Sequence, residues 1–142
     1  MNYPLIDEQS VFDAVILCDG DFPFHRIPLS VLHRNKFLCC CDNAGISAFD
    51  HGLTPDAIVG DGDSMPAGFR KSHSDIIHII DEQDDNDQTK ATRYCIGKGF
   101  RTIAYIGATG KREDHTLGNI SLMARYMDDF GIQPVMITDN GY

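Results

Sequence analysis

The chain has 142 residues, of which 42% are hydrophobic and 23% are charged, and its formal net charge is −9. These values are typical of a single soluble globular domain. No apolar run approaches the roughly 20 residues of a membrane span, and no secretory signal pattern opens the chain, so we expect a cytoplasmic protein. The negative charge argues against nucleic acid or an acidic membrane as a partner. It does not exclude a phosphate ligand, which acidic proteins bind through Mg²⁺.

Five cysteines are present, and Cys39, Cys40 and Cys41 are consecutive. Adjacent residues of a strand point to opposite faces, so these three thiols would chelate a metal poorly. No two cysteines have the C-x-x-C spacing. We therefore expect reduced, mostly buried thiols.

Six short apolar runs occur along the chain, and each ends in small or acidic residues. They cover residues 14–20, 37–45, 57–64, 76–81, 102–110 and 134–141. Runs that are apolar at nearly every position are typical of strands buried on both faces of a parallel sheet. Helical patterns at 45–53, 87–99 and 114–131 lie between several of them. The alternation predicts a three-layer, Rossmann-like α/β fold with a mostly parallel sheet and helices on both faces.

The helical pattern at 114–131 contains Leu117, Ile120, Ala124 and Met127 along one stripe. This spacing is typical of an amphipathic helix, and Gly131 marks its end.

Acids, glycines and amides follow the predicted strands, at residues 19–21, 42–45, 60–64, 81–87 and 107–115. Ligands of parallel α/β sheets bind beyond the carboxyl ends of the strands. The opposite edge of the predicted sheet has no comparable residues. This asymmetry predicts a ligand site at the carboxyl edge.

Asp61 and Asp63 flank Gly62 directly after a predicted strand. In extended geometry their side chains leave on the same side, and two carboxylates held together favour a divalent cation. A polar turn in which Asp63 or Ser64 caps a helix is the alternative.

A second acidic cluster covers residues 81–90, where Asp84 and Asp87 are three apart. That spacing would put both on one side of a helical first turn. Acids also suit a helix N-terminus without any ligand, but this cluster holds more of them than capping requires. An EF-hand is excluded because its glycine and distal glutamate are missing.

Residues 107–115 read GATGKREDH, a glycine-rich turn that leaves a strand and opens a helix. Such a turn presents backbone N–H groups to an anion, and Lys111 and Arg112 add positive charge. It is not a Walker A loop, because Tyr105 stands where the first glycine should be. The alternative is a connecting loop with a cap at Asp114.

CDNAG, PDAIVGDGDS, DEQDDNDQTKA and GATGKREDHTLGNI, in this order and spacing, resemble the thiamin pyrophosphokinase family over roughly residues 14–140. The resemblance implies Mg²⁺-dependent transfer of pyrophosphate from ATP to thiamin, giving thiamin diphosphate and AMP. It implies a homodimer with thiamin bound between subunits. It also implies a C-terminal β-sandwich domain, which we expect to be absent from this chain, so that residues 1–142 form the nucleotide-binding catalytic domain and the isolated domain makes little product.

Matched by position, the resemblance implies roles for individual residues. Asp61, Asp63 and Asp84 would hold Mg²⁺, and Asp87 or Asp63 would orient or deprotonate the thiamin hydroxyl. Arg112 would stabilise the charge that develops in transfer. The nucleotide-binding set would be Asp42, Asn43, Gly107, Thr109, Gly110, Lys111, Arg112, Asp114 and His115.

Two other functions remain open at this point. Asp19-Gly20-Asp21 has the D-x-D pattern of phosphatases that use an aspartate nucleophile, here Asp19, with Mg²⁺. A nucleotide-binding domain without catalytic activity is the second alternative.

Overall fold

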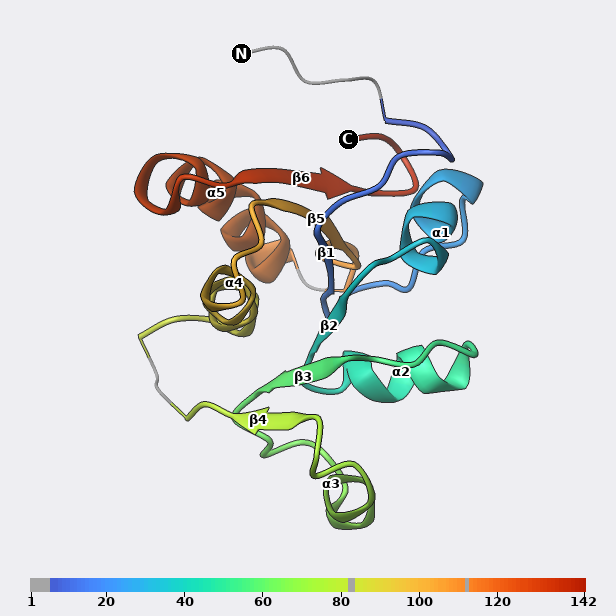
Figure 1. Cartoon of the computed structure of the whole chain (residues 1–142), viewed down its shortest axis with the longest axis vertical. Coiled ribbons are helices and arrows are strands. Elements are labelled where there is room, and N and C mark those ends of the chain that lie inside the picture. Colours follow the sequence, from blue (N-terminus) through green and yellow to red (C-terminus); the bar gives the residue numbers. More distant parts are fainter. Residues whose placement is uncertain (1–5, 82–83, 112) are drawn as a thin grey trace.

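The structure is a computed structural model, and it describes residues 6–81, 84–111 and 113–142 (Figure 1). Six strands form one sheet in the order β4-β3-β2-β1-β5-β6, and all the pairings between them are parallel. The strands are β1 (Ala14–Leu17), β2 (Leu38–Cys41), β3 (Ala57–Gly60), β4 (Ile77–Ile79), β5 (Thr102–Ile106) and β6 (Gln133–Ile137). The predicted strands and the predicted parallel α/β fold are confirmed.

Helices cover both faces of this sheet, as predicted. They are α1 (Arg26–His33), α2 (Ala44–Asp50), α3 (Ala67–Ser72), α4 (Asp87–Gly97) and α5 (Glu113–Phe130). In Figure 1, α1 and α2 lie on one side of the sheet, and α4 and α5 lie on the other. The sequence patterns predicted α2, α4 and α5 but not the short helices α1 and α3. Within the described ranges, no helix is both long and apolar enough to cross a membrane.

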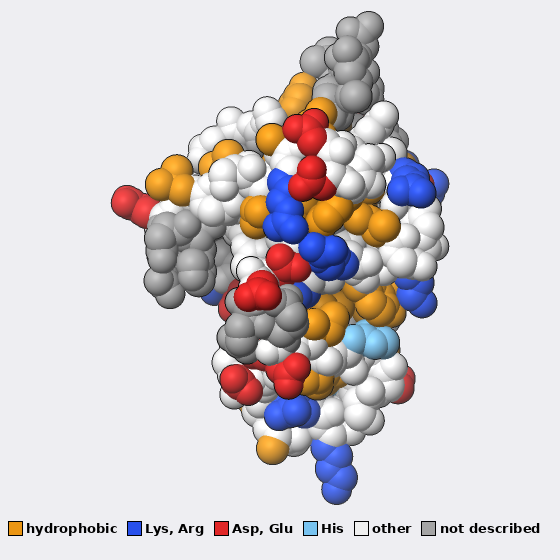
Figure 2. All heavy atoms as spheres, turned by 90° about the vertical axis from the view of Figure 1, so that its left-hand side faces the viewer, with side chains coloured by type: hydrophobic (Ala, Val, Ile, Leu, Met, Phe, Trp, Pro, Cys, Tyr) orange, Lys and Arg blue, Asp and Glu red, His pale blue; other side chains and the backbone are white. Residues whose placement is uncertain are grey.

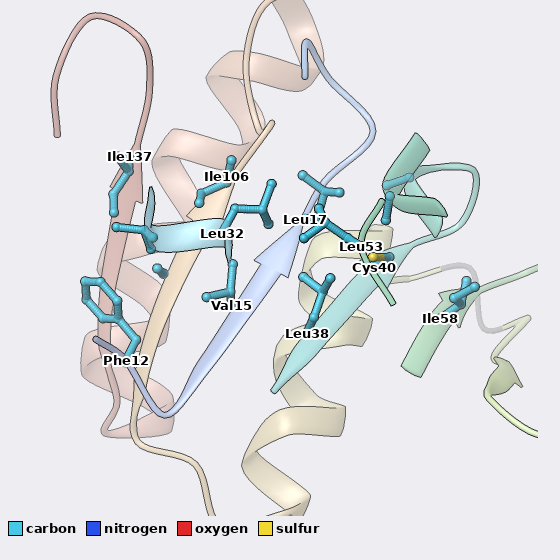
Figure 3. Close-up of a cluster of buried hydrophobic side chains, with 14 of the residues drawn as sticks. Phe12, Val15, Leu17, Leu32, Leu38, Cys40, Leu53, Ile58, Ile106 and Ile137 are labelled. Carbon is cyan, nitrogen blue, oxygen red and sulfur yellow. The ribbon is translucent and has the colours of Figure 1, made fainter. Parts of the chain in front are cut away.

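Each strand sends alternate side chains into two separate hydrophobic layers. Val15, Cys40 and Ile58 pack with Leu32 of α1 in one layer (Figure 3). Cys39 and Cys41 enter the other layer, beneath α4 and α5. The four inner strands, β1, β2, β3 and β5, are buried on both faces, which explains why the sequence is apolar at nearly every position there. All five cysteines are buried and free, as expected.

The apolar stripe predicted for α5 is not the buried one. Leu117 is 68% exposed and Ile120 is 48% exposed. The helix instead packs on the sheet through Tyr126, which is fully buried, together with a set of partly buried neighbours, Leu122, Met123 and Phe130. The two stripes have similar spacing, so the sequence pattern did not decide between them. In the structure that hydroxyl has partners on α4, so burial leaves it satisfied.

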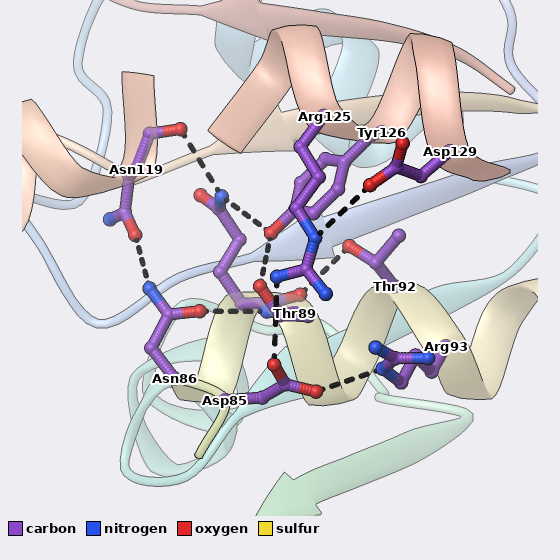
Figure 4. A network of polar contacts seen from close by, with 10 residues as sticks. Asp85, Asn86, Thr89, Thr92, Arg93, Asn119, Arg125, Tyr126 and Asp129 are labelled. Carbon is purple, nitrogen blue, oxygen red and sulfur yellow. Dashed lines mark hydrogen bonds and ion pairs between the residues drawn. The ribbon is translucent and has the colours of Figure 1, made fainter. Parts of the chain in front are cut away.

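A polar network joins the first turn of α4 to α5 (Figure 4). The Tyr126 hydroxyl lies 2.7 Å from Thr89 Oγ1 and accepts a hydrogen bond from Gln88 Nε2 at 3.1 Å. Nearer the surface, Asp85 pairs with Arg93 at 2.8 Å and with Arg125 at 3.6 Å. These contacts fix the start of α4 against α5.

The α1 layer provides a direct test of the core. Replacing the fully buried side chain in Leu32→Ala should lower the free energy of unfolding by about 2–5 kcal/mol, because it leaves a cavity. The matched change Leu117→Ala, on the exposed face of α5, should stay within about 0.5 kcal/mol of the parent. Urea unfolding measures both, and equal effects would contradict the packing described here.

Candidate functional site

A cavity of about 530 Å³ opens at the carboxyl ends of the strands, the edge at which the sequence predicts a ligand. Several separate connections contribute to its walls. The lining residues that the structure describes are Cys18, Asp19, Gly20, Cys41, Asp61, Asp85, Asn86, Asp87, Gln88, Lys90, Ala108, Lys111 and Asn119. Aspartates outnumber lysines in this set, so the described wall is acidic overall.

Asp61 lies in the cavity wall, directly after β3. The extended geometry expected for residues 61–63 is not found. Gly62 has a φ of 79°, and the Asp63 N–H donates a hydrogen bond to Asp61 Oδ1 at 3.0 Å. A turn of this kind suits glycine, because other residues rarely adopt that φ. Asp63 is exposed and is not one of the described lining residues.

Asp87 is the first residue of α4 and lines the same cavity. Asn86 caps the helix, since its Oδ1 accepts the Thr89 N–H at 3.0 Å. Asp84 lies before the helix, so the expectation that Asp84 and Asp87 share a helical turn is wrong. The chain needs Asn86 in non-helical geometry as the cap, and this places Asp84 outside.

Asp85 accounts for part of the acidic excess in this segment. Its carboxylate bridges Arg93 on α4 and Arg125 on α5 (Figure 4). Both guanidinium groups also lie over the ring of Phe130, at 4.9 and 5.5 Å from its centroid. Acidic and basic side chains are interspersed on this face of the molecule (Figure 2). Asp85 therefore links α4 to α5 and also lines the cavity.

The turn at 107–110 is fastened to the connection after β1. Gly20 N donates to Gly107 O at 2.6 Å, and Asp21 N donates to Thr109 O at 2.8 Å. A Cβ at position 20 would collide with the carbonyl oxygens of Gly107 and Thr109, so only glycine fits there. The Gly110 N–H donates to Thr116 Oγ1 at 3.3 Å. These contacts hold Ala108 and Lys111 in the cavity wall.

Lys111 and Asp19 lie next to each other where the 107–110 turn meets the connection after β1. Lys111 Nζ lies 3.8 Å from Asp19 Oδ1. Burial raises the pKa of the Asp19 carboxyl, and the positive charge of Lys111 partly opposes that rise. The ammonium group thus lies beside a carboxylate at the mouth of the cavity.

Asp42, at the end of β2, is buried with an unsatisfied oxygen. Its Oδ2 accepts a hydrogen bond from Ser64 Oγ at 3.1 Å, but Oδ1 has no partner in the described structure. Asn43 Oδ1, next to it, is also buried without a described partner. Burial raises the pKa of Asp42, and nearby carboxylates add to the rise. Two adjacent acceptors without partners are unusual in a folded protein, and ordered water commonly satisfies such groups; neither residue is among the described lining residues of the cavity.

Lys90 belongs to the cavity, although the sequence analysis did not single it out. The residue is only 5% exposed, and its Nζ donates to Ile80 O at 2.8 Å and lies 3.9 Å from Asp87 Oδ1. The buried ammonium group, fixed by Ile80 O, places a positive charge next to the Asp87 carboxylate. The spacing of Asp87 and Lys90, three apart on a helix, is the signal that would have revealed the pair.

Three of the predicted site residues have no described side chain. Arg112 and the side chains of Asp114 and His115 lie outside the described residues. No group of three or more His, Cys, Asp or Glu side chains in the described parts of the chain is arranged to hold a metal ion by itself. The roles predicted for Asp61, Asp63 and Asp84 as magnesium ligands therefore stay predictions.

The comparison with known families decides the assignment. The sequence profile described as "Thiamin pyrophosphokinase, catalytic domain" matches residues 29–135. The chain belongs to this family. The match includes every described segment that lines the cavity except the one after β1.

Similar proteins carry the same family name. Thiamine pyrophosphokinase 1 of Oryza sativa subsp. japonica is 26% identical over 164 residues, which cover 96% of this chain and 60% of that protein. A probable thiamine pyrophosphokinase from Staphylococcus saprophyticus has a similar solved structure, with a TM-score of 0.70, 27% identity, and coverage of 89% and 65% of the two chains. Yeast thiamin pyrophosphokinase matches with a TM-score of 0.72 at 14% identity, covering 94% and 61%, and supports the fold alone. The chain thus spans less than two thirds of these relatives.

The pKa shifts at two aspartates predict opposite effects of pH on stability. The pKa of Asp42 is raised from its ordinary value of 3.8, so its burial as a carboxylate destabilises the fold increasingly as the pH rises through the window that starts near 3.8. Asp42→Asn should therefore be more stable than the parent at pH 7, and the gain should shrink as the pH approaches 4.

Asp13 provides the matched control, because backbone hydrogen bonds from Arg101 and Thr102 lower its pKa. Its stabilising contribution is present above pH 3.8 and is lost as the pH falls through its lowered pKa. Asp13→Asn should lose stability at pH 7. Urea titrations of parent and variants between about pH 2 and 7 measure both effects. Stability changes of the same sign at pH 7 would contradict this account.

Proposed function

We propose that this chain is the nucleotide-binding catalytic domain of a thiamin pyrophosphokinase, which transfers pyrophosphate from ATP to thiamin and releases AMP. The observation that carries the proposal is one cavity into which Asp19, Asp61 and Asp87 project from separate connections, together with Lys90 and Lys111. Membership of the family supports ATP as the co-substrate and thiamin as the acceptor.

Magnesium fits the donors of this cavity. Carboxylate oxygens are hard ligands, and Mg²⁺ in phosphate-transfer sites is commonly held by one or two carboxylates with phosphate oxygens and water completing the shell. The carboxylates therefore need not form a complete site before the phosphate oxygens and water arrive. We propose Asp61 as a ligand, with Asp63 and Asp84 as further ligands. When bound, Mg²⁺ would neutralise charge on the phosphate chain, which the acidic wall would otherwise repel.

The chain's own groups would then position the reactants. Lys111, Arg112 and the turn containing Gly107, Thr109 and Gly110 would hold the phosphate oxygens. Asp114 and His115 would complete the nucleotide-binding set at the start of α5, with the Asp114 carboxylate as a hydrogen-bond acceptor. Preorganised charges of this kind supply most of the rate in phosphoryl transfer, because the transition state carries charge spread over its oxygens.

The reaction forms a bond from the thiamin hydroxyl oxygen to the β-phosphorus and breaks the bond from that phosphorus to the oxygen that stays with AMP. Asp87 would accept the hydroxyl proton or orient that hydroxyl, with Asp63 as the other candidate. The contacts of Lys90 with Asp87 and with Ile80 O would hold this carboxylate in position.

The two buried acceptors Asp42 Oδ1 and Asn43 Oδ1 would receive donors from the nucleotide or from its ordered water. We further propose that the complete enzyme is a homodimer with thiamin bound between subunits, and that a β-sandwich domain contributes to the thiamin site.

Asp61 provides the first test. In the complete gene product that contains these residues, Asp61→Asn should lower thiamin-dependent release of AMP from ATP about a hundredfold, because a group that stabilises the transition state is lost. Asp128→Asn, an exposed position near the carboxyl end of α5, removes the same charge away from the cavity and should keep the parent's rate. Activity of Asp61→Asn within about threefold of the parent would refute its assigned role.

A substitution of Lys111 tests whether the phosphate chain of the nucleotide lies beside this side chain. Lys111→Met should weaken binding of Mg-ATP about fivefold, equivalent to about 1 kcal/mol for a half-exposed charge, and should change AMP binding less. Lys98→Met is the matched control, since that ammonium group lies over the rings of Phe37 and Tyr94 and does not line the cavity. Titration calorimetry gives all four affinities. Equal weakening of ATP and AMP would contradict a contact with the phosphate chain.

A further inference from the structure

Two of the buried cysteines, Cys18 and Cys41, lie in the wall of the cavity. Cys18 directly follows β1, and Cys41 ends β2. The two strands are parallel, with Leu17 opposite Cys40, so continuing the register by one residue brings Cys18 beside Cys41. The hydrogen bond between these two thiols and burial raise the pKa of Cys41. Both side chains belong to the layer beneath α4 and α5 and line the same cavity, so the register places the two sulfur atoms on the same side of the sheet.

The backbone spacing is compatible with a covalent bond. Neighbouring strands lie about 4.8 Å apart. The Cα atoms of disulfide-bonded cysteines usually lie about 4.4–6.8 Å apart, so no change of strand pairing is needed. Cys18 is also at the end of its strand, where the backbone is less constrained than in the middle of the sheet.

The chain contains an internal comparison for this pair. Cys39 and Cys95 also share a hydrogen bond, but both are fully buried between the sheet and α4. Cys40 points into the opposite layer. Cys18 and Cys41 retain 6% and 2% exposure, and of the five cysteines they alone are among the described lining residues of the cavity. A small reagent that enters the cavity reaches this pair and no other.

We propose that Cys18 and Cys41 form an oxidisable dithiol in the wall of the cavity, which a hydroperoxide converts to a disulfide. The two thiols take no part in the nucleotide chemistry proposed above. No third protein ligand accompanies the two thiols among the described residues, which favours a disulfide over a bound metal ion.

The chemistry balances with hydrogen peroxide as the oxidant. The Cys18 sulfur attacks one peroxide oxygen as its proton leaves, the O–O bond breaks, and the departing hydroxide takes up that proton as water. The Cys41 thiol then attacks the sulfenic acid of Cys18, forming the S–S bond and releasing a second water. Two electrons pass from two thiols to one peroxide. Cys18 reacts first because it is the more exposed of the two.

The disulfide would change the wall of the cavity. It would bond Cys18, the neighbour of Asp19, to Cys41, the neighbour of Asp42. It would also remove the S–H group that lies 3.7 Å from Gln88 Oε1, the contact between Cys18 and the first turn of α4. The bond thus couples the oxidation state of the chain to the positions of groups that line the site.

Peptide mass spectrometry tests the proposal on the unmodified chain. The folded protein is treated with hydrogen peroxide, the excess is removed with catalase, and free thiols are alkylated after unfolding. We expect a Cys18–Cys41 linked peptide that dithiothreitol reverses, while Cys39, Cys40 and Cys95 are alkylated as in the untreated protein. Full alkylation of Cys18 and Cys41 after treatment, or oxidation of all five cysteines at equal rates, would overturn the proposal.

Two variants separate the order of events. In C41A, Cys18 should stop at the sulfenic acid and be labelled by dimedone, since the resolving thiol is missing. C95A removes one thiol of the fully buried pair Cys39 and Cys95. This variant should form the Cys18–Cys41 disulfide at the parent's rate. Loss of the disulfide in C95A, with the fold intact by circular dichroism, would contradict the assignment of the reactive pair.

Discussion

The parallel register of β1 with β2 and β5 is the constraint on which the cavity depends. Because β1 lies between these two strands, its carboxyl end meets theirs, and Asp19, Asp42 and the 107–110 turn gather around one point. The backbone bonds from Gly20 and Asp21 to the 107–110 turn extend the pairing beyond the strands. A slip of one residue would turn every side chain of β1 to the other face and would separate Cys18 from Cys41.

This arrangement has an electrostatic cost. The pKa values of Asp19 and Asp42 are raised chiefly by burial, so the folded chain disfavours their charged forms. Asp42 also keeps one oxygen without a described partner. Fold stability alone would select an apolar or amide side chain at such a position. Carboxylates retained at the ligand edge of the sheet are consistent with selection for binding at the expense of stability.

The fold could be predicted from the sequence further than the site could. Strands buried on both faces are apolar throughout, so their number and parallel arrangement follow from short-range patterns. Side-chain placement depends on geometry that such patterns do not encode. The turn at Gly62 replaced an extended segment, and the cap at Asn86 left Asp84 outside the helix. Lys90 was missed because a charge usually indicates exposure, and Tyr126 because the pattern did not decide between two stripes, whereas here each finds partners in the interior.

The first turn of α4 shows how the structure fixes a carboxylate at the cavity. Asp87 faces the cavity, while Gln88 contacts Cys18 and Tyr126. The Thr89 N–H donates to the capping side chain of Asn86, and Lys90 Nζ donates to Ile80 O. Three consecutive residues, Gln88, Thr89 and Lys90, are thus anchored, so the turn can neither rotate nor shift without losing several contacts at once. A carboxylate held in this way loses little entropy when a ligand binds, which is the property that a preorganised binding site requires.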